Sequence, residues 1–318
     1  MLSIVLPIFL VILTGYLFSR KSKYSKDAGK LINDYVLFIA LPALLFLSLA
    51  QAKPAELLHW EFVVATLFGI FVAYMFGIVL SMSRSISAPK SSIAAMAACY
   101  GTTGYMGVPI AIAVFGESAA VPAAIATILH NIPAIMAVII TYGIFSNEGK
   151  GESGVSVMLV AIKTTLLNPL TLSVIAGMIF SFLAIPLPEI LKTFTGFLAG
   201  AAGPTALFAL GIGLSSLDTK SHMNIKNLLH LSPIIFIKVF IQPFVTFLVA
   251  YYLLGMKSSD IYLIVAILMS AQPIGAGVYV FASKFDYFQE QTAVSIVISL
   301  LITVFSLSFL LEMMSKFI

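Results

Sequence analysis

Charged side chains are scarce in this chain of 318 residues, where Asp, Glu, Lys and Arg make up 9% and hydrophobic residues 60%. A soluble domain has about 25% charged residues, so a packed globular enzyme of this composition would lack a polar surface. Apolar runs of about 20 residues, the length that crosses a bilayer, fill almost the whole sequence. The composition therefore predicts an all-α, polytopic membrane protein with the lipid bilayer as its main partner.

Cysteine and histidine are equally scarce. The single Cys99 excludes an internal disulfide, and the four histidines are too scattered for a zinc pattern, so we expect no metal and no cofactor. No Ser–His, Cys–His or paired-carboxylate constellation lies within the apolar runs, which argues against an intramembrane enzyme. The net charge of +4 comes from loops between the runs and does not indicate a nucleic-acid partner.

Ten apolar segments can be placed as membrane spans. Their expected bounds are 2–18, 31–50, 62–82, 91–115, 119–145, 165–185, 194–217, 231–254, 260–283 and 291–314. Twelve Lys and Arg residues lie in the loops on one side of these spans, and four lie on the other. Cytoplasmic loops carry the excess of Lys and Arg, so both termini are expected outside the cytoplasm, in the plasma or inner membrane.

The two halves of the chain carry an internal repeat. Four residues recur 162 positions later, Pro7, Gly15, Pro42 and Phe46 as Pro169, Gly177, Pro204 and Phe208. With five spans in each copy, an odd number, the second copy is inverted in the membrane. We therefore predict an inverted 5+5 repeat over 1–146 and 165–318, joined by a cytoplasmic linker at 147–164; such repeats are typical of transporters.

One apolar segment in each half is interrupted by a run that cannot stay helical. The first run is Y-G-T-T-G-Y-M-G-V-P at 100–109, and the second is S-A-Q-P-I-G-A-G at 270–277. Glycine and proline break helices, and unwound backbone at bilayer depth is tolerated only where protein or a watery cavity receives it. Broken segments at matching positions of two halves indicate a transporter's binding site.

The ten-span layout, the G-T-T-G-Y-M-G-V-P break in span 4 and the A-Q-P-I-G break in span 9 resemble the auxin efflux carrier family. The short central loop is similar to the prokaryotic permease branch, some members of which are associated with malonate. The crossed, broken helices are also similar to those of the bile-acid/sodium symporters. The resemblance implies a scaffold of spans 1, 2, 6 and 7, a moving unit of spans 3–5 and 8–10, elevator-like alternation of access and a homodimer.

A half-helix that begins at the membrane midplane directs free N–H groups and a positive dipole end at an anion. We expect the two breaks to bind one carboxylate group. The helix-breaking crossover comprises Gly101, Gly107, Pro109 and Pro273. The expected substrate-binding residues are Thr102, Thr103, Gly104, Val108, Asn131, Gln272, Gly275 and Gly277. Alternatively, the glycines only allow close helix packing and the threonines bond to their own helix.

Four further polar residues are possible coupling or charge-carrying residues, and for three of them the sequence leaves more than one interpretation open. His130, beside Asn131 in span 5, could bind substrate, carry a proton or fix helix packing. Lys238 and Gln242 share a face of span 8, and Lys238 either supplies a buried positive charge or extends to the cytoplasmic interface. Asp34 at the start of span 2 fits an interfacial or helix-start carboxylate better than an ion ligand.

These features predict a secondary transporter for a small organic anion, a mono- or dicarboxylate. The alternatives are a sodium-coupled carrier of a larger organic anion, similar to the bile-acid symporters, and a channel or sensor on the same scaffold. Coupling to H⁺ through His130, coupling to Na⁺ through neutral oxygens, and uniport driven by the membrane potential all stay open.

Overall fold

The computed structural model describes residues 2–21, 25–145, 159, 162–163, 165–217 and 225–314. All regular secondary structure in these ranges is helical. Most of the expected linker at 147–164 lies outside the described residues. Among the described residues, six helices are long and apolar enough to cross a membrane, and further apolar helices are shorter. The length and composition of these helices are those of a multi-pass membrane protein.

The first half begins with two long helical segments and ends with another. Its elements are α1 (Leu2–Lys21), α2 (Ser25–Tyr35), η1 (Val36–Ala40), α3 (Leu41–Ala50), α4 (Pro54–Leu57), α5 (Trp60–Ser83), α6 (Ala88–Cys99), η2 (Thr103–Gly107), α7 (Val108–Phe115), η3 (Glu117–Ala119) and α8 (Ala120–Phe145). The prediction that Asp34 marks a helix start is wrong. The helix begins at Ser25, because the polar turns before the apolar run also stay helical, and Asp34 lies near the end of α2.

The second half repeats this order of long and interrupted helices. Its elements are α10 (Pro169–Phe182), α11 (Glu189–Ser216), α12 (Ile225–Phe236), η5 (Ile237–Ile241), α13 (Gln242–Leu248), η6 (Val249–Leu253), α14 (Ile261–Ser270), α15 (Gly277–Lys284) and α16 (Gln289–Met314). Side-chain caps fix two helix starts. Asn168 accepts from the Leu170 N–H and Asp260 from the Tyr262 N–H, both at 2.9 Å.

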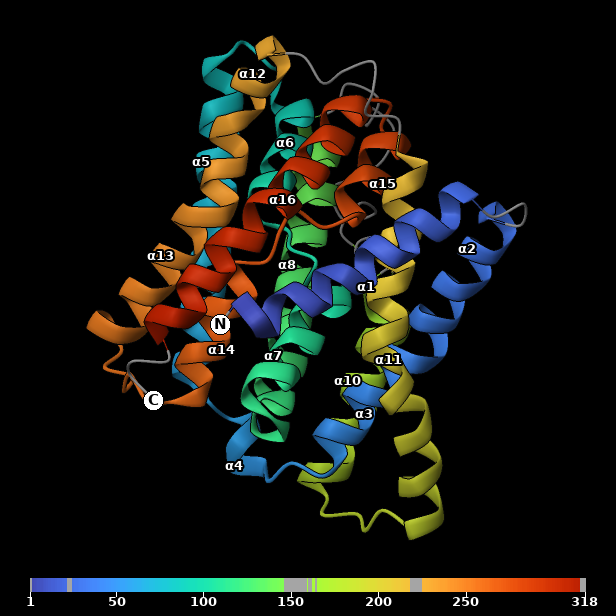
Figure 1. The fold of residues 1–318 in the computed structure, drawn as a ribbon. Helices are drawn as coiled ribbons and strands as arrows, with labels where there is room; N and C mark the ends of the chain where they lie inside the picture. The colour runs from blue at the N-terminus through green and yellow to red at the C-terminus, as the bar shows by residue number, and fades with distance from the viewer. Residues whose placement is uncertain are drawn as a thin grey trace.

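Two groups of helices pack within the molecule. In one group α1 lies along α11, and α3 lies along both α10 and α11. In the other, α5, α6 and α8 pack on one another, and α13 and α14 pack against them. The half-helix α7 extends toward the end of the molecule that carries α4, whereas α15 lies toward the end where α12 begins (Figure 1).

The aromatic contacts in the first group link the two halves of the chain. The rings of Phe18 and Phe208 lie 5.5 Å apart, and those of Phe46 and Phe180 lie 5.3 Å apart. Phe18 and Phe180 are themselves separated by 162 residues, a further identity of the repeat. Each half therefore supplies the same two aromatic positions to the other half.

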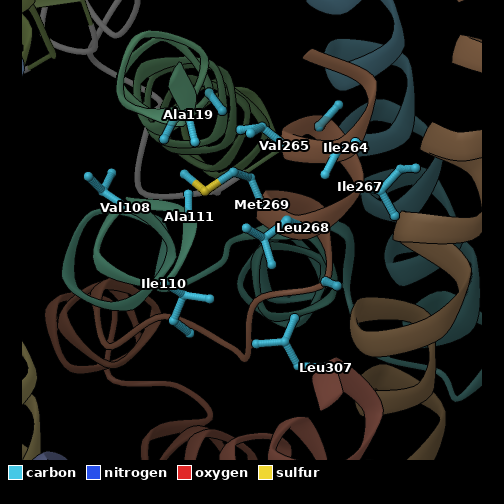
Figure 2. Packing of buried hydrophobic residues seen from close by; sticks show 14 of the residues in the cluster. Val108, Ile110, Ala111, Ala119, Ile264, Val265, Ile267, Leu268, Met269 and Leu307 are labelled. Atoms are coloured by element: carbon cyan, nitrogen blue, oxygen red, sulfur yellow. The ribbon is translucent and has the colours of Figure 1, made fainter. Parts of the chain in front are cut away.

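An apolar core surrounds the second half of the first broken segment. Figure 2 shows Ala111 of α7 beside Met269 of α14, and Val108 and Ile110 of α7 belong to the same apolar cluster. The Met269 sulfur comes so close to Gly107 that a Cβ there would lie 2.6 Å from it. Gly107 thus permits α7 and α14 to approach, and this packing sets the position of the two breaks relative to each other.

Candidate functional site

The two interrupted segments satisfy each other's backbone. Helix α6 ends at Cys99 and α14 at Ser270, and Gly101 and Ile274 then form an antiparallel bridge. The Thr102 N–H donates to the Pro273 carbonyl, and the Gly275 N–H donates to the Tyr100 carbonyl, both at 3.0 Å. Unwound backbone is costly in a membrane unless its polar groups are paired, and this short ladder pairs them.

Side chains satisfy the carbonyls at the end of α14. The Lys238 ammonium donates to the Ser270 carbonyl at 2.6 Å, and the Gln272 amide donates to the Leu268 carbonyl at 2.9 Å. Both side chains are fully buried. The alternative that Lys238 extends to the cytoplasmic interface is wrong, because its amine is buried and donates to the Ser270 carbonyl.

The second break also bonds to α16. The Ile274 N–H donates to the Ser299 hydroxyl oxygen at 3.0 Å, and that hydroxyl donates to the Ile296 carbonyl. Ser299 belongs to a row of buried hydroxyl residues with Thr292, Ser295 and Thr303. Their spacing of three or four residues places them on one helix face. Sequence reasoning missed Ser299, although this row of hydroxyls in an apolar helix was the signal for it.

The Tyr100 ring covers the glycines of the second break. A Cβ at Gly275 would lie 2.6 Å from ring carbons, and one at Gly277 would lie 2.9 Å from the hydroxyl oxygen. The Tyr100 hydroxyl donates to the Asn131 side-chain oxygen at 2.5 Å, and the Asn131 amide donates to the Thr127 carbonyl at 2.7 Å. Tyr100 therefore joins Asn131 to both breaks, a role that its position in the sequence does not indicate.

Several polar atoms buried in this region have no hydrogen-bond partner among the described residues. They are Thr103 Oγ1, His130 Nε2, Gln272 Oε1 and both amide atoms of Gln242. His130 uses its other ring nitrogen, which lies 2.9 Å from the Ala126 carbonyl. Buried polar groups are nearly always bonded in native proteins, so unbonded ones indicate a place for water, ion or ligand.

The remaining predicted residues lie away from the bridge. Asp34 is on α2, where its neighbour Asn33 accepts from the Tyr105 hydroxyl at 2.7 Å. Gly104 lies near the side chains of Leu41 and Thr127. Val108 and Pro109 begin α7. A Cβ atom placed on Gly203 of α11 would lie 3.5 Å from the Cβ of Pro109.

An open cavity of about 690 Å³ lies between the first group of helices and the segment that runs from α7 into α8. It is lined by α1, α3 and α11 on one side and by α7, η3 and the start of α8 on the other. Pro109 is the one predicted site residue in its lining, and Ser48, Gln51, Glu56 and Glu117 are its main polar residues. Among the described residues, no three His, Cys, Asp or Glu side chains gather as a metal site.

A sequence model of the family described as "Membrane transport protein" matches residues 1–311, which is nearly the whole chain. The chain belongs to this family. It is the family of the auxin efflux carriers, so the resemblance carried by the two broken segments is confirmed. A membrane transport protein moves its substrate rather than converting it, so the family is not one of enzymes.

Bacterial and archaeal transporters are similar to this membrane transport protein along most of their length. A Rhizobium meliloti protein named "Putative malonate transporter" is 28% identical over 316 residues, which cover 97% of this chain and 94% of the relative. The "Uncharacterized transporter YfdV" of Escherichia coli is 23% identical and covers 93% and 92%. "Uncharacterized transporter MJ1031" of Methanocaldococcus jannaschii is 26% identical and covers 67% and 69%.

Proposed function

We propose that this membrane transport protein is a secondary transporter of a small organic anion, a mono- or dicarboxylate, and that the anion binds where the two broken helices pair. The observation that carries the proposal is the buried polar cluster at the bridge, with unbonded atoms on Thr103, His130 and Gln272. The name of the Rhizobium meliloti relative supports malonate as the first substrate to test.

The ends of the half-helices give the region its preference for anions. The continuous helical run of η2 and α7 begins at Thr103, because the Val108 N–H already donates to the Thr103 carbonyl, and α15 begins at Gly277. The first turn of a helix has free N–H groups and a partial positive charge of about 0.5. A carboxylate between these ends would accept from the N–H groups and from the Thr103 hydroxyl and the Asn131 amide.

The packing of the helices supports the elevator arrangement. The first group of helices corresponds to the expected scaffold of spans 1, 2, 6 and 7, and the second group to the moving unit. The cavity lies along the boundary between these groups, and Pro109 at the start of α7 is part of its wall. The cavity opens at helix ends that the Lys and Arg distribution assigns to the extracytoplasmic side, so we assign this conformation to the outward-facing state.

Binding of an anion does not by itself determine the direction of transport. An anion that leaves the cell gains about 2.3 kcal/mol per charge per 100 mV of membrane potential, which is enough to drive export without a coupled ion. We therefore propose that the protein exports or exchanges carboxylates at the cell membrane. We further propose that its ten segments form two inverted halves and that it works as a homodimer.

Uptake of radiolabelled malonate into proteoliposomes tests the proposal. We expect saturable uptake that unlabelled mono- and dicarboxylates inhibit, with voltage, pH and sodium varied one at a time. A bile acid in the same assay tests the sodium-coupled alternative with a larger substrate. Absence of flux for every carboxylate under every gradient would contradict the proposal, and single-channel currents would indicate a channel instead.

An isosteric substitution tests the position of the site. Thr103→Val removes the unbonded hydroxyl and keeps the volume of the side chain, so we expect the KM for the anion to rise about tenfold. Thr195→Val is the matched control, since Thr195 is buried on α11 and is not part of the bridge or the cavity wall. Equal KM values for the two variants would remove Thr103 from the site.

A further inference from the structure

Lys238 is the one Lys, Arg, Asp or Glu residue among the buried polar residues of the described ranges. It lies in the π-helical turn η5, inside the long helix that runs from α12 to η6. Single π-turns in helices occur often at functional sites. No Asp or Glu lies near the middle of any span in the sequence, and among the described residues no carboxylate forms an ion pair with this ammonium group.

The balancing charge comes from helix ends. The Lys238 ammonium donates to the carbonyl of Ser270, the last residue of α14. The ammonium group also lies beside Gly101, since a Cβ atom placed on Gly101 would be 3.3 Å from Nζ. Gly101 comes two residues after Cys99, the last residue of α6, so the ammonium group lies close to the end of that helix as well. Each helix end carries a partial negative charge of about 0.5, so two ends together offset about one positive charge.

These helix ends are a place where transporters bind their coupling ions. In broken-helix transporters, unwound carbonyls and the C-terminal ends of half-helices coordinate Na⁺ or H⁺. Here a covalently attached ammonium makes the contact with the Ser270 carbonyl, and the Gln272 oxygen close by remains unbonded. An isolated buried ammonium would be very costly, and contact with carbonyl dipoles is what makes this one tolerable.

We propose that Lys238 is a resident cation: its ammonium group permanently occupies, between the ends of α6 and α14, the position where an exchangeable coupling cation would bind, so that transport needs no sodium. The inference deepens the proposed function of the same site. Its transport test rests on that function, whereas its binding test does not.

The binding test uses purified protein without substrate. Lys238→Ala removes the ammonium and leaves space, so we expect the melting temperature to rise in methylammonium chloride or sodium chloride relative to choline chloride at equal ionic strength. Binding to the folded state raises stability by mass action. Wild type and the control Lys192→Met, which changes an exposed lysine of α11, should melt equally in the three salts. Equal melting of Lys238→Ala in the three salts would overturn the proposal.

The transport test compares the same salts in proteoliposomes. Wild-type malonate flux should be equal in sodium and choline, and a wild-type flux that rises with sodium overturns the proposal even if Lys238→Ala fails to fold. We expect the flux of Lys238→Ala to fall about tenfold or more in choline and to recover in sodium or methylammonium. Lys238→Met fills the space with an apolar chain and should not recover. If wild type carries no anion at all, the proposed function fails while the melting test still decides this inference.

Discussion

Gly15 of α1 lies directly against the backbone carbonyl of Phe208 on α11, with no space for a Cβ atom. Gly177 of α10 lies in the same way against the backbone carbonyl of Phe46 on α3, where a Cβ would be 2.9 Å from the oxygen. These four residues are two of the pairs separated by 162 positions, and the structure joins them crosswise. Such reciprocal contacts are what a two-fold relationship between two copies produces, which supports the inverted repeat.

Substitution of these glycines should destabilise the protein. Gly15→Ala and Gly177→Ala each force α1 or α10 away from its neighbour, at a cost of about 1–3 kcal/mol of unfolding free energy. Gly213→Ala is the control, because nothing lies within 4 Å of a Cβ at that position of α11. Thermal unfolding in detergent checks the effect. Equal melting of the three variants would show that the close approach of these helices does not contribute to stability.

The hydrogen bond between Tyr100 and Asn131 should couple the first break to α8. Tyr100→Phe removes the hydroxyl donor and keeps the ring that covers Gly275 and Gly277, so we expect a loss of about 0.6–2 kcal/mol. Asn131→Ala should cost a similar amount, and the double variant should cost less than the sum of both. A double-mutant cycle on the unfolding free energy measures the difference. Strict additivity would show that the two groups do not interact.

The cavity between the two helix groups should be accessible from outside the cell. Ala113 is an exposed residue of α7 in the cavity wall, so a membrane-impermeant maleimide should label Ala113→Cys in whole cells. The native Cys99 is fully buried and supplies an unreactive background. Ser83 is exposed at the C-terminal end of α5, which is expected on the cytoplasmic side, so Ser83→Cys should be labelled only after the cells are opened. Labelling of Ser83→Cys alone in intact cells would reverse the proposed orientation.

The charge of Glu117 should slow the entry of anions into this cavity. Glu117 is exposed in the cavity wall, so Glu117→Lys should raise the initial rate of anion uptake from that side by roughly two- to tenfold at low salt. The increase should fade near 0.1 M salt, where the Debye length is about 10 Å. Glu189→Lys, exposed on α11 but not in the cavity wall, is the control and should have little effect.

The sequence predicts the break positions well, because glycine and proline act locally on the backbone. It also places Gln272, Pro273 and Thr102 within the breaks, where the structure finds them in the hydrogen bonds that pair the breaks and close the end of α14. The contacts that hold the breaks together depend on distant residues, however. Lys238 lies 32 residues before its carbonyl partner Ser270, and nothing in the local pattern indicates the direction in which its side chain points.

The same limit explains the residues that were placed wrongly or missed. Asp34 was expected at a helix start because hydrophobicity alone defined the span, whereas the preceding polar turns also form helix. Tyr100 was visible only as part of the first break, and its contacts with Asn131 and Gly277 arise from the packing of three separate segments. Side-chain partners across helices follow from tertiary packing, which a single sequence does not specify.

The Ser299 hydroxyl should be required for the shape of the second break. It accepts from the Ile274 N–H, a buried donor that has no helical partner because α14 has already ended. Ser299→Ala leaves this N–H unpaired, which should cost about 1–3 kcal/mol of unfolding free energy and lower the transport rate. Ser295→Ala is a matched control on the same helix, since the Ser295 hydroxyl bonds to the Gln291 carbonyl four residues back. Thermal unfolding and malonate flux should therefore differ between the two variants. Equal values for both would mean that the break keeps its shape without α16.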